Sequence, residues 1–144
     1  MAELLKDCCI DSQILSEKHH LAIEGTANIT VYADRNRLEQ VIINLISNAI
    51  KYSPDADKVV INVGRVGDYI KISVTDFGIG IPKETLPFLF DRFYRVDEVS
   101  QRYSGLGLGL YISAEIVRRH NGDIGINSTP GEGSTFWFTI PTAE

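Results

Sequence analysis

One helix-length segment, residues 34–52, constrains the fold of this 144-residue chain more than any other. Its apolar side chains recur at intervals of three and four, which predicts an amphipathic helix, and Asp34 stands where an N-cap belongs. The predicted buried face consists of Leu38, Val41, Ile42, Leu45, Ile46, Ala49 and Ile50. A polar stripe beside it consists of Gln40, Asn44, Asn48 and Lys51.

This polar stripe needs a partner because it borders the apolar face. A buried carboxamide that lacks a hydrogen-bond partner costs about 1–3 kcal/mol. A metal-bound phosphate would satisfy the carboxamides of Asn44 and Asn48 and the ammonium of Lys51 together. The segment therefore predicts that a phosphate ligand binds beside the helix.

Glycines mark the other segments that would approach such a ligand. Seven of the twelve glycines fall into three clusters, at 78–80, 105–109 and 131–133. Glycine permits a positive φ and a close approach of the backbone to a ligand, although a single cluster can be an ordinary turn. Three clusters together with a polar helix face indicate a ligand site.

Composition narrows the class of protein. The length and the 44% apolar content predict a single domain over residues 1–144. The net charge of −5 and the lack of a basic run argue against nucleic acid as a partner. No apolar run reaches the length of a membrane span, and Cys8 and Cys9 are adjacent, where a disulfide rarely forms. We therefore expect a cytoplasmic location and no membrane contact from this segment. A membrane anchor of the parent protein would lie outside it.

The order of predicted elements indicates the fold. We expect helices at 3–18, 34–52 and 107–120, short helical turns within 82–93, and strands at 20–24, 29–32, 59–63, 69–75, 123–128 and 134–140. The first two strands would pair around a turn at 25–28, and the next two would form a hairpin closed by 64–68. Asn121 and Gly122 supply a left-handed helix stop. This pattern predicts an α+β fold, a two-layer α/β sandwich in which helices cover one face of a mixed β-sheet.

Read in order, these segments resemble the catalytic and ATP-binding domain of sensor histidine kinases. That domain belongs to the GHKL ATPases, which also include DNA gyrase and mismatch-repair ATPases. Residues 44–52 look like the N box, 76–80 the first glycine box, 90–95 the F box, 105–110 the second glycine box, and 131–135 the closing glycine-rich turn. The ATP lid would span about residues 92–108. The resemblance covers nearly the whole chain.

The resemblance implies an adenine site around Asp76. Its carboxylate would accept a hydrogen bond from the exocyclic amine of adenine, and it would select against guanine because an ionised carboxylate cannot donate. Gly78 and Gly80 would let the backbone pass close to the base, while Ile79 and Ile81 would wall the pocket. Without the other boxes, Asp76 would read as a turn former at the end of a strand.

The resemblance also assigns the phosphate end of the site. Asn48 would offer its side-chain oxygen to Mg²⁺, supported by Asn44 one turn earlier. Lys51 would approach the phosphates, Tyr52 would pack near the sugar or base, and Arg95 would reach the γ-phosphate. The implied catalytic residues are thus Asn48, Lys51 and Arg95, and the implied cofactors are ATP and Mg²⁺.

The lid completes the implied site. The remaining nucleotide-binding positions are Gly105, Gly107, Leu108, Gly109 and Thr135. Phe90 and Phe93 are interpreted as packing residues that position the lid. The chain departs from the family pattern at Leu106, where a Ser or Thr is common, and at Phe77, which replaces a polar residue after Asp76. We therefore expect phosphate contacts at the lid to come from backbone amides.

The implied function is donation of the ATP γ-phosphate to a histidine on a dimerisation domain that this chain lacks. The partners would be that phosphoacceptor domain and a response regulator downstream. Two alternatives are a GHKL ATPase that hydrolyses ATP and a non-catalytic module that senses nucleotide. Residues 51–52 and 90–95 favour the kinase. Residues 76–78 spell the DFG of eukaryotic protein kinases, but the chain lacks the other motifs of that fold.

Overall fold

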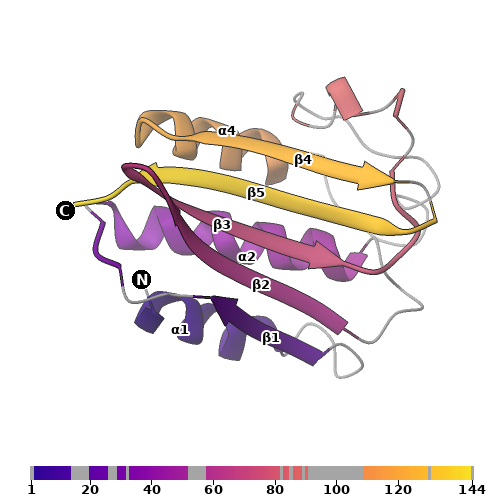
Figure 1. Cartoon of the computed structure of the whole chain (residues 1–144), viewed down its shortest axis with the longest axis horizontal. Coiled ribbons are helices and arrows are strands. Elements are labelled where there is room, and N and C mark those ends of the chain that lie inside the picture. Colours follow the sequence, from indigo (N-terminus) through magenta and orange to yellow (C-terminus); the bar gives the residue numbers. More distant parts are fainter. Residues whose placement is uncertain are drawn as a thin grey trace.

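The computed structural model describes residues 2–13, 20–25, 29–31, 33–51, 58–81, 83–84, 86–88, 90, 109–129 and 131–143. Its helical elements, labelled as in Figure 1, are α1 (Ala2–Gln13), α2 (Arg35–Lys51), the 3₁₀ turn η1 (Leu86–Phe88) and α4 (Gly109–Arg119). Its strands are β1 (His20–Gly25), β2 (Lys58–Val66), β3 (Tyr69–Asp76), β4 (Asp123–Thr129) and β5 (Gly133–Pro141).

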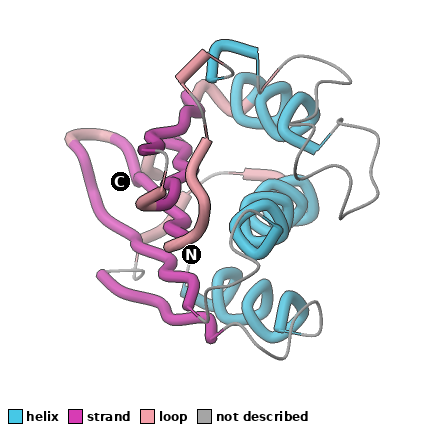
Figure 2. The backbone as a smooth tube through the Cα atoms, turned by 90° about the vertical axis from the view of Figure 1, so that its right-hand side faces the viewer, coloured by secondary structure: helices cyan, strands magenta, loops and turns pink. Residues whose placement is uncertain are grey.

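The five strands form one mixed sheet in the order β1-β2-β3-β5-β4. β1 runs parallel to β2, and every other neighbouring pair is antiparallel. Figure 2 shows the sheet and the three α-helices as two separate layers. The predicted two-layer sandwich with a mixed sheet is confirmed.

Helix α2 occupies the centre of the helical layer and packs against β3, β5 and the other two α-helices. Its buried residues are the seven predicted from the helical spacing. The Asp34 carboxylate caps its N-terminus, since Oδ1 accepts hydrogen bonds from the backbone N–H groups of Asn36 at 3.0 Å and Arg37 at 3.2 Å. An ion pair of 2.7 Å between Arg35 and Asp7 links the start of α2 to α1.

Strict alternation in β3 and β5 separates the two faces of the sheet. Ile70, Ile72 and Val74 of β3 are fully buried under the helices, as are Phe136 and Phe138 of β5. The intervening residues of both strands are partly exposed on the opposite face, which none of the described helices covers (Figure 2). This alternation decides which side chains at the strand ends face the helical layer.

The predicted strand at 29–32 is wrong. Among its described residues, 29–31, Val31 makes only an isolated bridge with Thr142, and β1 pairs with β2 instead. The parallel register sets Leu21 beside Val59, on the face that the helices cover, and helix α2 lies in the crossover between the two strands. The turn residues at 25–28 predicted a local strand pair, but the burial of apolar side chains between the sheet and the helices favours the distant pairing of β1 with β2.

The hairpin of β2 and β3 is tighter than predicted. The ladder continues to the pair Val66 and Tyr69, so a two-residue turn of Gly67 and Asp68 closes it, where residues 64–68 were expected to form the turn. Gly67 has a φ of +60°, which suits a short turn between twisted strands. At the end of α4, Asn121 has a φ of +61°, so the predicted left-handed stop is confirmed.

The N-terminal helix was predicted to reach residue 18, and residues 14–19 lie outside the described ranges. Within the described ranges, no helix has the length and apolar character needed to cross a membrane.

Candidate functional site

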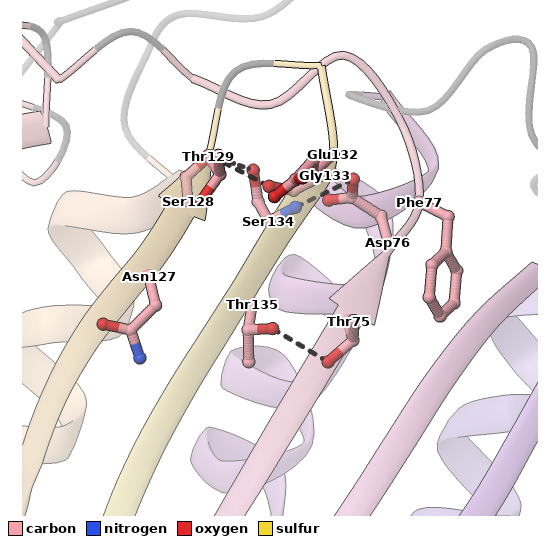
Figure 3. Close-up of a pocket in the computed structure, with 10 residues that line it drawn as sticks. All are labelled: Thr75, Asp76, Phe77, Asn127, Ser128, Thr129, Glu132, Gly133, Ser134 and Thr135. Carbon is pink, nitrogen blue, oxygen red and sulfur yellow. Dashed lines mark hydrogen bonds between the residues drawn. The ribbon is translucent and has the colours of Figure 1, made fainter.

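Asp76, the last residue of β3, is a buried carboxylate with only half of its hydrogen bonds made. Its exposed fraction is 1%. Oδ1 accepts hydrogen bonds from the backbone N–H groups of Gly78 at 3.0 Å and Ser134 at 3.3 Å. Oδ2 is also buried and has no hydrogen-bond partner among the described residues. Figure 3 shows the carboxylate between the start of β5 and the chain that follows β3.

The electrostatics of Asp76 follow from this burial. Removal from water raises the pKa of the carboxyl from 3.8 to about 6, and the hydrogen bonds from Gly78 and Ser134 oppose that rise. A buried polar oxygen without a partner is unfavourable and is rare in folded proteins. Oδ2 is thus set up to accept a hydrogen bond from a donor outside the described residues.

A surface pocket of about 270 Å³ opens at the ends of β3, β4 and β5 (Figure 3). The hydroxyls of Thr75 and Thr135, 3.0 Å apart, lie on its wall. Because β5 alternates, Thr135 belongs to the helix-free face, and Ser134 belongs to the same face as the carboxylate of Asp76. The structure therefore brings Ser134, and not Thr135, to Asp76. The alternation of Phe136 and Phe138 was a sequence signal for the face on which Ser134 lies, and the register of β5 on β3 then pairs Ser134 with Asp76.

Ser128, on β4, joins the two segments that surround Asp76. Its hydroxyl accepts a hydrogen bond from the backbone N–H of Ile81 at 2.7 Å and lies 2.7 Å from the hydroxyl of Ser134. The same hydroxyl is 3.1 Å from the carbonyl of Gly133. The sequence argument did not select Ser128 because a lone serine in a strand carries no signal.

Polar side chains of α2 face α4. The Asn44 amide nitrogen donates to the Ser113 hydroxyl at 3.2 Å and to the Gly109 carbonyl at 3.4 Å. The Asn48 amide nitrogen donates to the Asn44 carbonyl at 2.9 Å. This hydrogen bond orients the carboxamide of Asn48, and its Oδ1, which can only accept, is the atom suited to a cation.

The other predicted site residues take defined places or lie outside the described ranges. Lys51 ends α2 and Gly109 begins α4. Gly80 has a φ of +72°, Ile81 is fully buried, and Phe90 is partly buried against the hydrophobic core. The predicted residues outside the described ranges are Tyr52, Phe93, Arg95, Gly105, Gly107 and Leu108.

The described residues contain no group of three or more His, Cys, Asp or Glu that could hold a metal ion. Any cation beside α2 would therefore take most of its ligands from elsewhere, as Mg²⁺ does when it keeps waters and binds substrate phosphates. The single oxygen of Asn48 fits that pattern.

The mixed sheet and the one-sided helical layer define a two-layer α/β domain, and the carboxylate at the end of β3 marks a candidate ligand site at one end of the sheet. Residues 33–144 match the family described as histidine kinase-, DNA gyrase B-, and HSP90-like ATPase, and the chain belongs to this family. The predicted resemblance is thereby confirmed, and ATP is the ligand of the family.

Relatives with similar sequences are sensor histidine kinases. The chain is 42% identical over 137 residues to the sensor histidine kinase WalK of Bacillus subtilis, covering 92% of the chain and 22% of WalK. It is 46% identical over 122 residues to the sensor-like histidine kinase SenX3 of Mycolicibacterium smegmatis, covering 84% of the chain and 32% of SenX3. The chain thus spans less than a third of each relative.

Solved structures agree with the fold. The catalytic domain of the histidine kinase ThkA, in a nucleotide-free form, superposes with a TM-score of 0.83 at 30% identity, over 98% of this chain and 91% of that one. The mycobacterial sensor histidine kinase MprB superposes with a TM-score of 0.87 at 23% identity, over 99% of this chain and 94% of that one, and it supports the fold alone.

Proposed function

We propose that this chain binds ATP with Mg²⁺ and donates the γ-phosphate to a histidine on a dimerisation domain of its parent sensor histidine kinase. The observation that carries the proposal is the buried, unpartnered Oδ2 of Asp76. The relatives, which are sensor histidine kinases, favour phosphoryl donation over the two alternatives, ATP hydrolysis and nucleotide sensing.

Asp76 recognises the base. Its Oδ1 is held by the amides of Gly78 and Ser134, which fixes the carboxylate so that Oδ2 accepts the exocyclic N–H of adenine. Guanine carries a carbonyl at the corresponding position, and two acceptors would then face each other in a buried site. This arrangement supports selection of ATP over GTP.

The α2 face and the start of α4 bind the phosphates. Oδ1 of Asn48 is the proposed protein ligand of Mg²⁺, which neutralises phosphate charge when bound. The hydrogen bonds of Asn44 hold α2 against α4 and so position Asn48 relative to the N-terminus of α4. The backbone amides at that N-terminus favour a phosphate. Lys51 adds a positive charge at the end of α2.

The remaining assignments rest on the resemblance alone. Arg95 would stabilise charge on the γ-phosphate, and Tyr52 and the lid residues at 105–109 would enclose the nucleotide. The bond between the γ-phosphorus and the β–γ bridging oxygen would break, ADP would leave, and a bond from the phosphorus to a ring nitrogen of the acceptor histidine would form. The acceptor must therefore lie in line with the breaking bond. The proposed partners are that domain and a response regulator, and the proposed compartment is the cytoplasm.

Calorimetric titration with ATP, with and without Mg²⁺, tests the proposal. Asp76→Asn should weaken ATP binding about 10- to 100-fold, since a charge-assisted hydrogen bond is lost in a buried site. Asn48→Ala should weaken binding only when Mg²⁺ is present. GTP is the control ligand for wild type. Equal affinity of wild type for ATP and GTP, or unchanged ATP affinity in a folded Asp76→Asn variant, would contradict the adenine assignment.

Addition of the parent's dimerisation domain separates the functions. With ATP labelled on the γ-phosphate, label on the acceptor histidine supports the kinase. Release of free labelled phosphate alone would support an ATPase, and binding without either product would support a sensing module.

A further inference from the structure

The hydroxyl of Ser128 lies where three structural segments meet: β4, the start of β5 and the segment after β3. It accepts a hydrogen bond from the backbone N–H of Ile81, in the segment after β3. It also hydrogen-bonds to the hydroxyl of Ser134 and to the carbonyl of Gly133, both on β5. We propose that Ser128 is a positioning residue of the adenine site, which holds these segments so that Asp76 presents Oδ2 to the base. This inference rests on the proposed function.

The hydrogen bonds of Ser128 use its full capacity. A serine hydroxyl has one proton to donate and two lone pairs to accept with. The N–H of Ile81 takes one lone pair, since it can only donate. If Ser128 donates to the Gly133 carbonyl, the Ser134 hydroxyl donates to the second lone pair, and all three short contacts are satisfied at once. Ser128 then has no capacity for a ligand and acts only through its neighbours.

Those neighbours carry both donors to Asp76. Ser134, on β5, donates its backbone N–H to Oδ1 of Asp76. Gly78, which lies with Ile81 in the segment after β3, donates its N–H to the same oxygen. Ser128 is the side chain that links these two segments. Its loss would leave the N–H of the fully buried Ile81 without a partner and would free the Ser134 side chain. The orientation of the Asp76 carboxylate would then be less restricted.

A second contact keeps the segments together when Ser128 is changed. The N–H of Gly131 donates to the carbonyl of Ile79 at 2.7 Å, so the turn between β4 and β5 stays attached to the segment after β3. The β4 and β5 ladder also continues over seven pairs from Asp123 to Thr129. Removal of the Ser128 hydroxyl is therefore expected to change the geometry around Asp76 and leave the fold in place.

The test compares Ser128→Ala and Ser128→Cys with wild type in calorimetric titrations of ATP from pH 5 to 8. Ser128→Cys keeps the approximate size of the side chain but loses its strong hydrogen bonds, so it controls for the loss of packing contacts in Ser128→Ala. Ser73→Ala is the matched control, because Ser73 lies on β3 on the helix-free face and outside the pocket. We expect both Ser128 variants to bind ATP about tenfold more weakly, and the control to bind like wild type.

The pH profile distinguishes positioning from a general loss of stability. The Ser134 N–H lowers the pKa of Asp76, so loosening that contact should move the midpoint of the ATP affinity profile to higher pH in both Ser128 variants. Wild-type affinity in the variants, or weaker binding with an unchanged midpoint, would overturn the proposal. Failure of wild type itself to bind ATP would instead refute the proposed function.

Discussion

The raised pKa of Asp76 makes a quantitative prediction about the ligand-free domain. The carboxyl titrates near pH 6 in the folded state against 3.8 for the ordinary group, because burial disfavours its charge. At about 1.4 kcal/mol per pKa unit, ionisation of Asp76 costs the folded state about 3 kcal/mol. Since the folded pKa lies above the unfolded one, this contribution to stability is complete below about pH 3.8 and is lost as pH rises through 6.

The measurable part of this change lies above pH 5. From pH 5 to pH 8 the free energy of unfolding should fall by about 1.4 kcal/mol through Asp76 alone. Other groups titrate in the same range, so the reference is Asp76→Asn, which keeps an oxygen for the amides of Gly78 and Ser134 and does not ionise. Urea denaturation at each pH gives the free energy of unfolding of both proteins.

The expected result is a difference that changes with pH. Asp76→Asn should gain about 1.4 kcal/mol relative to wild type between pH 5 and pH 8, or about 0.5–1 M urea in the midpoint. A difference that stays constant over this range would show that the carboxylate is better solvated than its burial implies, and would refute the reasoning. Saturating ATP should reduce the effect, because the adenine N–H stabilises the ionised form.

Two further predictions concern the support of the site. Gly133→Ala should destabilise the domain by about 1–3 kcal/mol, because φ is +112° and a Cβ there would meet the carbonyl of Asp76. Gly67 also has a positive φ but lies in open space, so Gly67→Ala should cost less in the same urea assay. His120→Ala should lower the free energy of unfolding by about 0.5–1.5 kcal/mol, because Nε2 accepts the N–H of Asp34 at 3.1 Å, and an unchanged urea midpoint would contradict this.

Three hydrogen bonds position α2 and α4 relative to each other, where the phosphate end of the proposed site lies. His120, just after α4, accepts the N–H of Asp34 at the start of α2. His120 thus joins the end of α4 to the start of α2, and Asn44, near the middle of α2, joins it to the first turns of α4 through Gly109 and Ser113. Asn48 lies one turn beyond Asn44, so its carboxamide follows directly on the contact of α2 with α4.

The sequence was most informative where a repeating pattern recorded the environment of a whole face. The seven buried residues of α2 follow from spacing because a helix face that packs on a sheet must be apolar throughout. The same principle applied to β5 would have placed Ser134 on the face that the helices cover. Local turn signals were weaker evidence, and they led to the wrong strand at 29–32 and to too long a turn at 64–68.

By itself, the sequence determined the helical face, the order of the boxes and the membership in an ATPase family, because each depends on residues close together in the chain. The tertiary structure alone decided the parallel pairing of β1 with β2 and the hydrogen bonds of Asp76 with Ser134. It also decided the contact of Ser128 with Ile81, which is 47 residues away. These features depend on which distant segments meet when the sheet buries one face, and spacing along a chain does not record that.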